Sequence, residues 1–276
     1  LRAVTEVLND GEHLLVEAGT GVGKSIAYLL PAALYAMKNG ARVVVSTNTI
    51  NLQEQLVSKD IPAVARVLGD AAGPLRATTL KGRTNYLCVR RWGRLRSSAG
   101  LSGEEARLLG KLACWLPETT TGDRSELNMG RPDQIVWDRL SAQGSPDCPA
   151  TEGPCFLRSA RERAEAAHIV VVNHSLLLSD LERGGGLLPA HDRLIVDEAH
   201  HLEAEATRQF GARISHEQLL EALNALGGPR GLSAEALDAY RTSRAADSRR
   251  EATVRGVETL EEAIGGARFR VDALFE

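Results

Sequence analysis

The residues best suited to chemistry lie near the start of the chain, in a glycine-rich stretch that ends in lysine and serine. It spans residues 17–25 and reads Glu-Ala-Gly-Thr-Gly-Val-Gly-Lys-Ser. Glycines let the backbone point successive N–H groups at an anion, and a following helix adds the partial positive charge of its N-terminus. Lys24 would then reach the β- and γ-phosphates of a nucleotide, and the Ser25 hydroxyl would hold Mg²⁺. We therefore predict a nucleotide site formed by Ala18, Gly19, Thr20, Gly21, Val22, Gly23, Lys24 and Ser25.

The segments on either side of this loop have the character that such a site requires. Residues 12–16 are short and apolar, as a buried parallel strand should be, and residues 26–37 form an apolar segment of helical length. A strand, a glycine-rich turn and a helix in that order form the context of a phosphate-binding loop. Residues 1–10 are predicted to form a helix that leads into the first strand.

A second apolar segment ends in paired acids much later in the chain. Residues 193–196 are predicted to form a parallel strand, and Asp197-Glu198-Ala199-His200 follows. Asp197 would hold Mg²⁺ through water, and Glu198 would act as general base on the attacking water. His200 would couple the site to a neighbouring domain. The alternative is a pair of acids at a helix N-terminus, a common arrangement, but the earlier nucleotide loop favours the catalytic interpretation.

Two segments between these motifs have features of a nucleic-acid interface. Residues 41–47 are predicted to form a strand, and the helix after it has Asn48 and Thr49 available as caps; phosphate contacts and plain capping are both open for these groups. Residues 76–115 hold nine lysines and arginines against two acids, with aromatic residues among them. That composition suits a single strand, and a solvated helix face is the alternative. The predicted contacts are Thr47, Thr49, Gln53, Lys81, Arg83, Tyr86, Arg90 and Arg91.

Four cysteines lie in the middle of the chain: Cys88, Cys114, Cys148 and Cys155. Prolines and a glycine between the last two keep that segment in turns, which allows both thiolates to point at one centre. Thiolates suit an iron–sulfur cluster or Zn²⁺, and the spacing is not that of a zinc ribbon. Cys114 lies in an apolar helical segment, where a buried structural thiol is the alternative to a fourth ligand.

Composition limits the class of protein. The chain has 276 residues, 43% of them apolar, and a formal net charge of −3, which allows one large or two modest domains. The longest apolar run is shorter than the ~20 residues of a membrane span, and no signal peptide precedes it. Cysteines of this kind argue for a reducing compartment, so we expect a cytoplasmic location and no membrane contact. Residues 166–172 are predicted to form another strand, and residues 202–276 to form helices with a break at 227–229. Neither end has the character of a natural terminus, so we expect a fragment.

With these segments in view, the chain resembles the iron–sulfur superfamily 2 DNA helicases of the DinG and XPD kind. The nucleotide loop has alanine at its first position, as in superfamily 2 helicases. Further matching segments follow in family order: Ser-Thr-Asn-Thr-Ile-Asn-Leu-Gln-Glu-Gln-Leu from residue 46, Lys-Gly-Arg-Thr-Asn-Tyr-Leu-Cys from 81, Cys-Phe-x₃-Ala-Arg from 155, Val-Val-Asn-His-Ser-Leu-Leu from 171 and Asp-Glu-Ala-His-His-Leu-Glu from 197.

The resemblance implies an α/β fold. A RecA-like P-loop motor domain with a parallel sheet would occupy residues 1–78 and 166–206, interrupted by an Fe–S cluster domain at 79–165 and followed by the start of a helical arch insertion at 207–276. It also implies ATP-driven 5′–3′ translocation on single-stranded DNA with duplex unwinding, in repair or replication. ATP, Mg²⁺ and a 4Fe–4S cluster would be the cofactors. Single-stranded DNA and DNA junctions would be the partners of a monomer whose second motor domain lies outside this stretch.

The family's cysteine pattern is met only in part. Helicases of the DinG kind place three cysteines close together where this chain has Cys148 and Cys155, so either Cys114 serves as a ligand or the cluster is altered or lost. Two other functions stay open. One is a non-catalytic nucleic-acid-binding module that keeps a relic motor, and the other is a helicase fused to an exonuclease.

Overall fold

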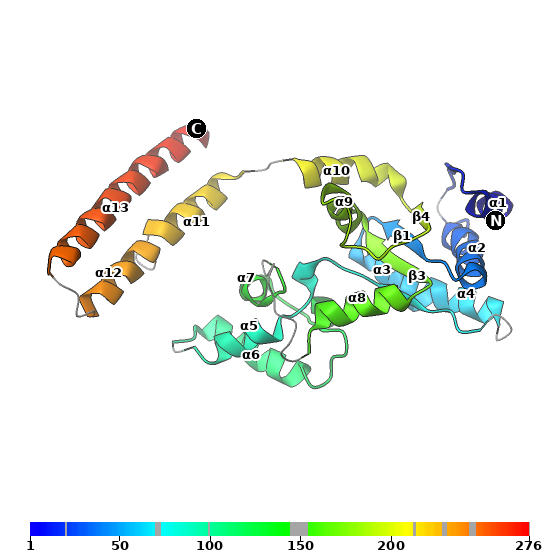
Figure 1. Cartoon of the computed structure of the whole chain (residues 1–276), viewed down its shortest axis with the longest axis horizontal. Helices are drawn as coiled ribbons and strands as arrows, with labels where there is room; N and C mark the ends of the chain where they lie inside the picture. Colours follow the sequence, from blue (N-terminus) through cyan, green and yellow to red (C-terminus); the bar gives the residue numbers. More distant parts are fainter. Residues whose placement is uncertain are drawn as a thin grey trace. The chain divides into compact units, whose positions relative to one another are not determined.

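A computed structural model describes the chain except for residues 20, 70–72, 99, 144–153, 212–213, 228–230, 243–246 and 276 (Figure 1). The described residues divide into two compact units, Leu1–Phe210 and Gly211–Glu276. The first unit contains both predicted nucleotide motifs. No helix in the part of the chain that is described combines the length and the apolar character needed to cross a bilayer.

A parallel sheet of four strands organises the first unit, in the order β2-β3-β1-β4. Its strands are β1 (Val43–Thr47), β2 (Ala77–Thr79), β3 (Ile169–Asn173) and β4 (Arg193–Val196). The register places Val43 of β1 opposite Ile169 on one side and Arg193 on the other. The α/β class with a parallel sheet is confirmed. The short strand β2 was not predicted, because its Ala-Thr-Thr sequence carries little apolar signal.

Helices cover both faces of this sheet. The helical segments of the first unit outside residues 80–155 are α1 (Arg2–Asp10), α2 (Lys24–Asn39), α3 (Ile50–Gln55), η1 (Leu56–Asp60), α4 (Ile61–Leu68), α8 (Phe156–Ala166), α9 (His174–Glu182), η5 (Ala199–His201) and α10 (Leu202–Phe210). Alternate valines of β1 face opposite layers. Val43 and Val45 belong to a core with α2 and α4, whereas Val44 belongs to a core with α8 and α9. This burial explains why the two central strands, β1 and β3, each contain a run of apolar residues.

The strand predicted at residues 12–16 is not formed, so that prediction was wrong. The stretch is irregular, and Leu15 and Val16 are 92% and 61% exposed. Helix α1 ends at Gly11, whose φ is 77°, and the Arg193 side chain donates a hydrogen bond to the Leu8 carbonyl. The chain beyond α1 makes no ladder with β4. An apolar run becomes a strand only where a neighbour pairs its N–H and C=O groups, and apolar composition does not guarantee that pairing.

Residues between β2 and α8 build a separate layer. Its helical segments are η3 (Arg83–Asn85), α5 (Val89–Arg96), α6 (Gly103–Trp115), η4 (Arg124–Glu126) and α7 (Arg131–Leu140). Leu108, Leu112 and Trp137 are fully buried in one apolar cluster. The Trp137 indole N–H donates to the Thr84 carbonyl at 2.8 Å, which ties this cluster to the first turn of the layer.

Gly122 is the tightest point of this layer, and its substitution gives a prediction for stability. Its φ is 64°, and a Cβ there would lie 2.1 Å from Cγ of Phe156. We expect Gly122→Ala to lower the free energy of unfolding by about 2–4 kcal/mol, because backbone strain and a steric overlap add. Urea denaturation of the purified protein measures this loss.

Gly100 provides the matched control for that substitution. It lies in the same layer with φ of 77°, but nothing lies within 4 Å of a Cβ built there. Gly100→Ala should therefore cost only the backbone term, about 1–2 kcal/mol. Equal losses for the two variants would contradict the proposed overlap with Phe156.

The described residues of the second unit form three helices: α11 (His216–Gly227), α12 (Leu232–Thr242) and α13 (Asp247–Phe275). Val257 and Ile264 of α13 are buried in it, and His216 lies 2.7 Å from Asp272. The helices predicted for residues 202–276 are confirmed where the chain is described, and α11 ends at Gly227 within the predicted break.

Candidate nucleotide site

The glycine-rich loop leads into α2 as predicted. Gly21 and Gly23 have φ of 78° and 81°, values that glycine adopts at little cost. Gly23 is the N-cap of α2, and no side chain caps that end, which leaves backbone N–H groups for an anion. Ala18 is half-buried, and Gly19 and Val22 are exposed. Thr20 lies outside the described residues.

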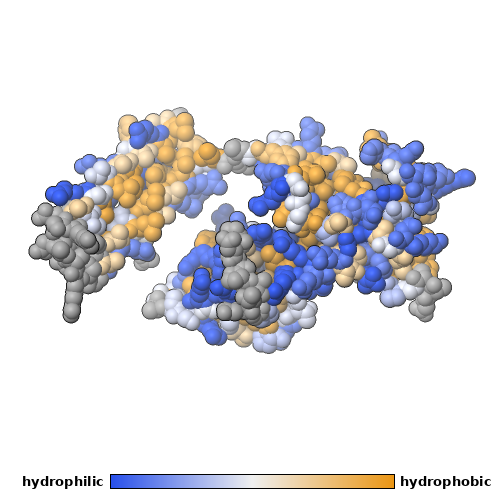
Figure 2. Space-filling view, in the orientation of Figure 1, coloured by the Kyte–Doolittle hydropathy of each residue, from blue (hydrophilic) through white to orange (hydrophobic). Residues whose placement is uncertain are grey.

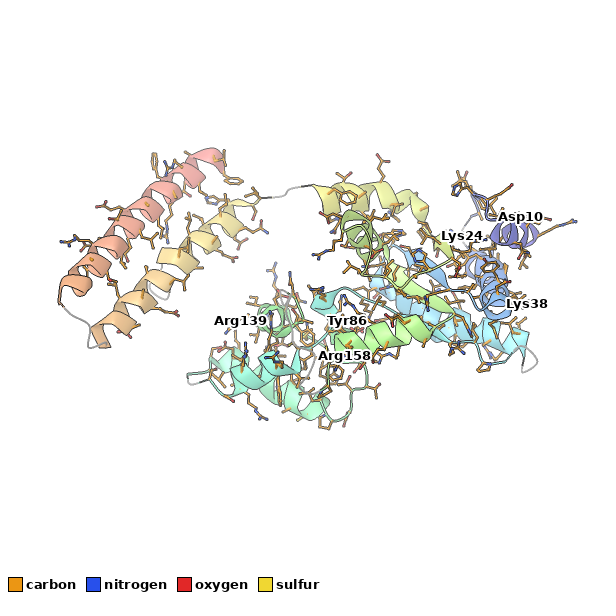
Figure 3. The ribbon with its side chains drawn as sticks, in the orientation of Figure 1. Asp10, Lys24, Lys38, Tyr86, Arg139 and Arg158 are labelled. Atoms are coloured by element: carbon orange, nitrogen blue, oxygen red, sulfur yellow. The ribbon has the colours of Figure 1, made fainter. Side chains whose placement is uncertain are left out.

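The lysine of the loop meets the acid pair. The Lys24 ammonium lies 3.0 Å from Oε1 of Glu198, although 174 residues separate them. Lys24 lies at the end of α2 next to the sheet (Figure 3). The Tyr28 hydroxyl donates to Oδ2 of Asp197 at 3.1 Å. The structure therefore brings the two sequence motifs together at the carboxyl ends of the strands, where ligands of open α/β sheets bind.

The ion pair keeps both of its members charged. The hydrogen bond to Glu198 raises the pKa of Lys24, and the same bond lowers the pKa of the Glu198 carboxyl. A phosphate that binds the ammonium would compete with Glu198 for it.

The backbone of Glu198 is strained. Its φ is 54°, the one positive value at a non-glycine residue among those described. Such a conformation costs about 1–3 kcal/mol and is concentrated at functional sites. Two hydrogen bonds hold the turn: the Asp197 N–H donates to the Ser46 carbonyl at 2.8 Å, and the Glu198 N–H donates to Oδ1 of Asp197 at 3.1 Å.

His200 lies at the surface of this turn. Its Nδ1 is 3.6 Å from Oε2 of Glu198, and its ring lies 4.0 Å from that of His201, centroid to centroid. The side chain is 66% exposed. The imidazole is therefore a solvent-exposed group next to the acid pair.

His174 is a buried residue beneath this site and was not among the predicted site residues. It is fully buried, and its Nδ1 lies 2.8 Å from Oγ of Ser46, the residue whose carbonyl holds Asp197. Burial lowers the pKa of this imidazole, so the neutral form prevails. The Asn-His pair after the apolar strand was the available signal, because a polar pair at a strand end marks the site edge of a parallel sheet.

The side chains present fit a magnesium–nucleotide complex. Asp197 offers a carboxylate and Ser25 a hydroxyl, the oxygen ligands that Mg²⁺ prefers. The Tyr28 hydroxyl donates a hydrogen bond to Asp197. Lys24 and the uncapped N-terminus of α2 supply positive charge for phosphates. When bound, the ion would neutralise phosphate charge.

Several predicted nucleic-acid contacts have structural roles instead. Lys81 is 4% exposed, and its ammonium is engaged by Glu54, Asp123 and Ser125. Tyr86 is buried, and its hydroxyl accepts a hydrogen bond from the Lys81 N–H. The prediction that Lys81 and Tyr86 contact DNA directly is therefore not supported by this structure, because internal partners occupy their polar groups. Burial also raises the pKa of Tyr86 to about 12.

The end of β1 is also more buried than predicted. Thr47 and Gln53 are fully buried, and the Gln53 amide donates to the Val171 carbonyl. These two are likewise not exposed for a strand of DNA. Thr49 caps α3 by accepting from the Leu52 N–H at 3.2 Å, so the capping interpretation of this hydroxyl is confirmed.

A cavity of about 600 Å³ opens beside the N-terminus of α3. Four arginines line it, and none is ion-paired within the described part of the chain: Arg83, Arg124, Arg161 and Arg183. Of these, only Arg83 was predicted. Hydrophilic residues dominate the visible face of α8, which contributes to the lining (Figure 2). Arg91 donates to the Ser141 carbonyl, and Arg90 is half-buried. The cavity is a positively charged hollow suited to a phosphate backbone.

Two of the four cysteines start helices in the same region. Cys88 is the N-cap of α5 and Cys155 that of α8, and both are half-buried free thiols. Their neighbours in sequence both contact Gly122: the Leu87 N–H donates to its carbonyl, and the Phe156 ring lies against it. Two thiols at this place fit part of a cluster site.

The other two cysteines do not complete that site in what is described. Cys114 is exposed on α6, about 200° around the helix from the buried Leu112, so the alternative of a buried structural thiol is wrong. Cys148 lies outside the described residues. Among the described residues, no group of three or more His, Cys, Asp or Glu side chains is arranged to hold a metal ion.

The geometry defines the class, and sequence comparison agrees with it. Residues 1–71 match the family model described as DEAD/DEAH box helicase. The chain is 34% identical over 229 residues to the 3′-5′ exonuclease DinG of Bacillus subtilis (82% of this chain, 24% of the relative). It is 37% identical over 241 residues to the ATP-dependent helicase DinG of Mycobacterium tuberculosis (79% and 35%). It is 39% identical over 231 residues to the ATP-dependent DNA helicase YoaA of Escherichia coli (79% and 35%).

The resemblance to DinG-type superfamily 2 helicases is thereby confirmed. The chain spans between 24% and 35% of the length of these relatives. The activities named for these relatives belong to proteins about three to four times as long as the aligned stretch.

Proposed function

We propose that this chain contributes the nucleotide-binding motor domain of an ATP-dependent DNA helicase. The observation that carries the proposal is the 3.0 Å contact between Lys24 and Glu198, which joins the phosphate-binding loop to the acid pair. In this function Lys24 binds phosphate, Ser25 and Asp197 hold the magnesium ion, and Glu198 accepts a proton from the attacking water. His200 carries the state of this site to a second motor domain.

The proposed domain limits follow the sequence motifs. Residues 1–78 and 166–206 form the motor domain, 79–165 the insertion and 207–276 the beginning of an arch. The apolar cluster around Trp137 supports a core of its own within 79–165, whereas Leu80, Tyr86, Ala160 and Ala164 of that range pack in a core of the sheet.

The DNA strand would lie along the positive cavity next to α3. Arg83 and Arg161 from the insertion and Arg183 from the motor part line it, and unpaired guanidinium groups are suited to phosphates. Thr49 is the N-cap of α3, and this helix begins beside the same cavity, so Thr49 remains a proposed phosphate contact. Arg90 and Arg91 remain proposed contacts. Polarity of 5′–3′ and a role in repair or replication rest on the family resemblance.

The assay that tests this function is ATP turnover by the complete protein with and without single-stranded DNA. We expect DNA to stimulate hydrolysis and duplexes with a single-stranded end to be unwound. Turnover that DNA leaves unchanged would favour the non-catalytic module with a relic motor. An exonuclease attached elsewhere is the second candidate, favoured by the printed name of the Bacillus subtilis relative. Nuclease activity that survives loss of ATP turnover would support it.

A 4Fe–4S cluster is proposed for the insertion, with Cys88 and Cys155 as ligands and Cys148 and Cys114 as candidates for the remaining positions. The residues next to Cys88 and Cys155 in sequence, Leu87 and Phe156, both contact Gly122, and this supports a shared site for the two thiols. The complete protein purified without oxygen is expected to be brown and to contain iron and sulfide. Colourless protein that contains zinc would contradict the cluster, and Cys88→Ser should remove the iron while Cys114→Ser tests the fourth position.

A further inference from the structure

We propose that Tyr28 is a positioning residue for the magnesium site, which it serves by fixing the Asp197 carboxylate in advance. The inference rests on the proposed function, and Tyr28 belongs to none of the sequence motifs that predicted the site. The residue lies on α2, one turn after Lys24, and is 9% exposed.

The Asp197 carboxylate is held at both oxygens. The Tyr28 hydroxyl donates to Oδ2 at 3.1 Å, and the Glu198 N–H donates to Oδ1 at 3.1 Å. Without the phenol, the carboxylate would keep the hydrogen bond from the Glu198 N–H but lose the one at Oδ2, so rotation about the Cβ–Cγ bond would be less restricted. Tyr28 therefore limits the directions in which Asp197 can present its lone pairs.

The ring fixes the hydroxyl in place. Tyr28 belongs to the apolar core that contains Leu29, Ala32 and Val45, between α2 and β1. A phenol has few rotatable bonds, so a ring buried on one side of the sheet carries its hydroxyl to a defined point. Residues that orient metal ligands in this way commonly change metal affinity or activity by about 10- to 100-fold when they are replaced.

Tyr28→Phe tests the inference, because it removes the hydroxyl and keeps the ring in the core. Binding of a fluorescent ATP analogue to the complete protein is titrated with Mg²⁺ and again with EDTA, and Mn²⁺ binding is followed by electron paramagnetic resonance. We expect Mn²⁺ affinity and the gain in nucleotide affinity from Mg²⁺ to fall by about 10-fold or more. Nucleotide affinity in EDTA should stay unchanged.

Tyr35→Phe is the matched control. Tyr35 lies on the same helix, and its ring packs under the Arg193 guanidinium at 5.0 Å, away from the acid pair. It should leave both titrations unchanged. Unaltered Mn²⁺ affinity in Tyr28→Phe would overturn the inference, as would an equal loss of nucleotide affinity in EDTA, which indicates altered packing. A wild-type protein that binds no nucleotide in either titration would overturn the proposed function and this inference with it.

Discussion

Lys24→Ala in the complete protein is expected to lower ATP turnover by about 10²- to 10³-fold. The Lys24 ammonium is the one side-chain cation at the start of α2, and no other residue of the loop can replace its charge. Its partner Glu198 stays exposed to solvent through 28% of its side chain, so removal of the lysine leaves no deeply buried charge. The fold should therefore survive, and steady-state hydrolysis with circular dichroism measures both consequences.

Lys38 provides the control for this substitution. It lies in the last turn of the same helix and is exposed (Figure 3). Lys38→Ala removes the same charge from α2 without touching the loop, and turnover should stay within a factor of about two of the wild type. Full residual activity in Lys24→Ala would contradict the nucleotide site itself.

The nucleotide site was predictable because its chemistry is local in sequence. The loop, the strand that leads to Asp197 and the helix cap at Thr49 each lie within a few consecutive residues, and the parallel sheet brings their ends to one edge. The strand predicted at residues 12–16 was wrong for the opposite reason. Whether an apolar segment pairs depends on a neighbouring strand, which its own sequence does not specify.

The nucleic-acid contacts were harder to predict, because composition does not report burial. Lys81 belongs to the basic segment, yet Asp123, more than forty residues later, and Glu54 from α3 enclose it. Arg161 and Arg183 lie outside that segment but line the cavity. Tertiary contacts decide whether a charged side chain is paired internally or free for a ligand, and the local sequence does not show them. The same holds for Tyr28, whose apolar helical setting gave no sign of Asp197.

Glu198→Gln is expected to separate nucleotide binding from hydrolysis. Glutamine keeps the shape of the side chain but accepts no proton, so turnover should fall by about 10²- to 10⁴-fold, the contribution of a general base. Nucleotide affinity should rise, because the Lys24 ammonium is no longer held by a carboxylate at 3.0 Å. Titration of a fluorescent ATP analogue beside the hydrolysis assay measures the two effects. Glu203→Gln, at an exposed position in the first turn of α10, should change neither.

The strained backbone adds a second test at the same residue. Glu198 adopts φ of 54°, a conformation that costs a residue with a Cβ about 1–2 kcal/mol and costs glycine little. Glu198→Gly should therefore abolish hydrolysis as fully as Glu198→Gln while leaving the midpoint of urea denaturation unchanged or higher. That combination would show that the turn is held in this geometry for its chemistry rather than for stability. Hydrolysis that persists in both variants would instead assign the proton transfer to another group and leave Glu198 only its ion pair with Lys24.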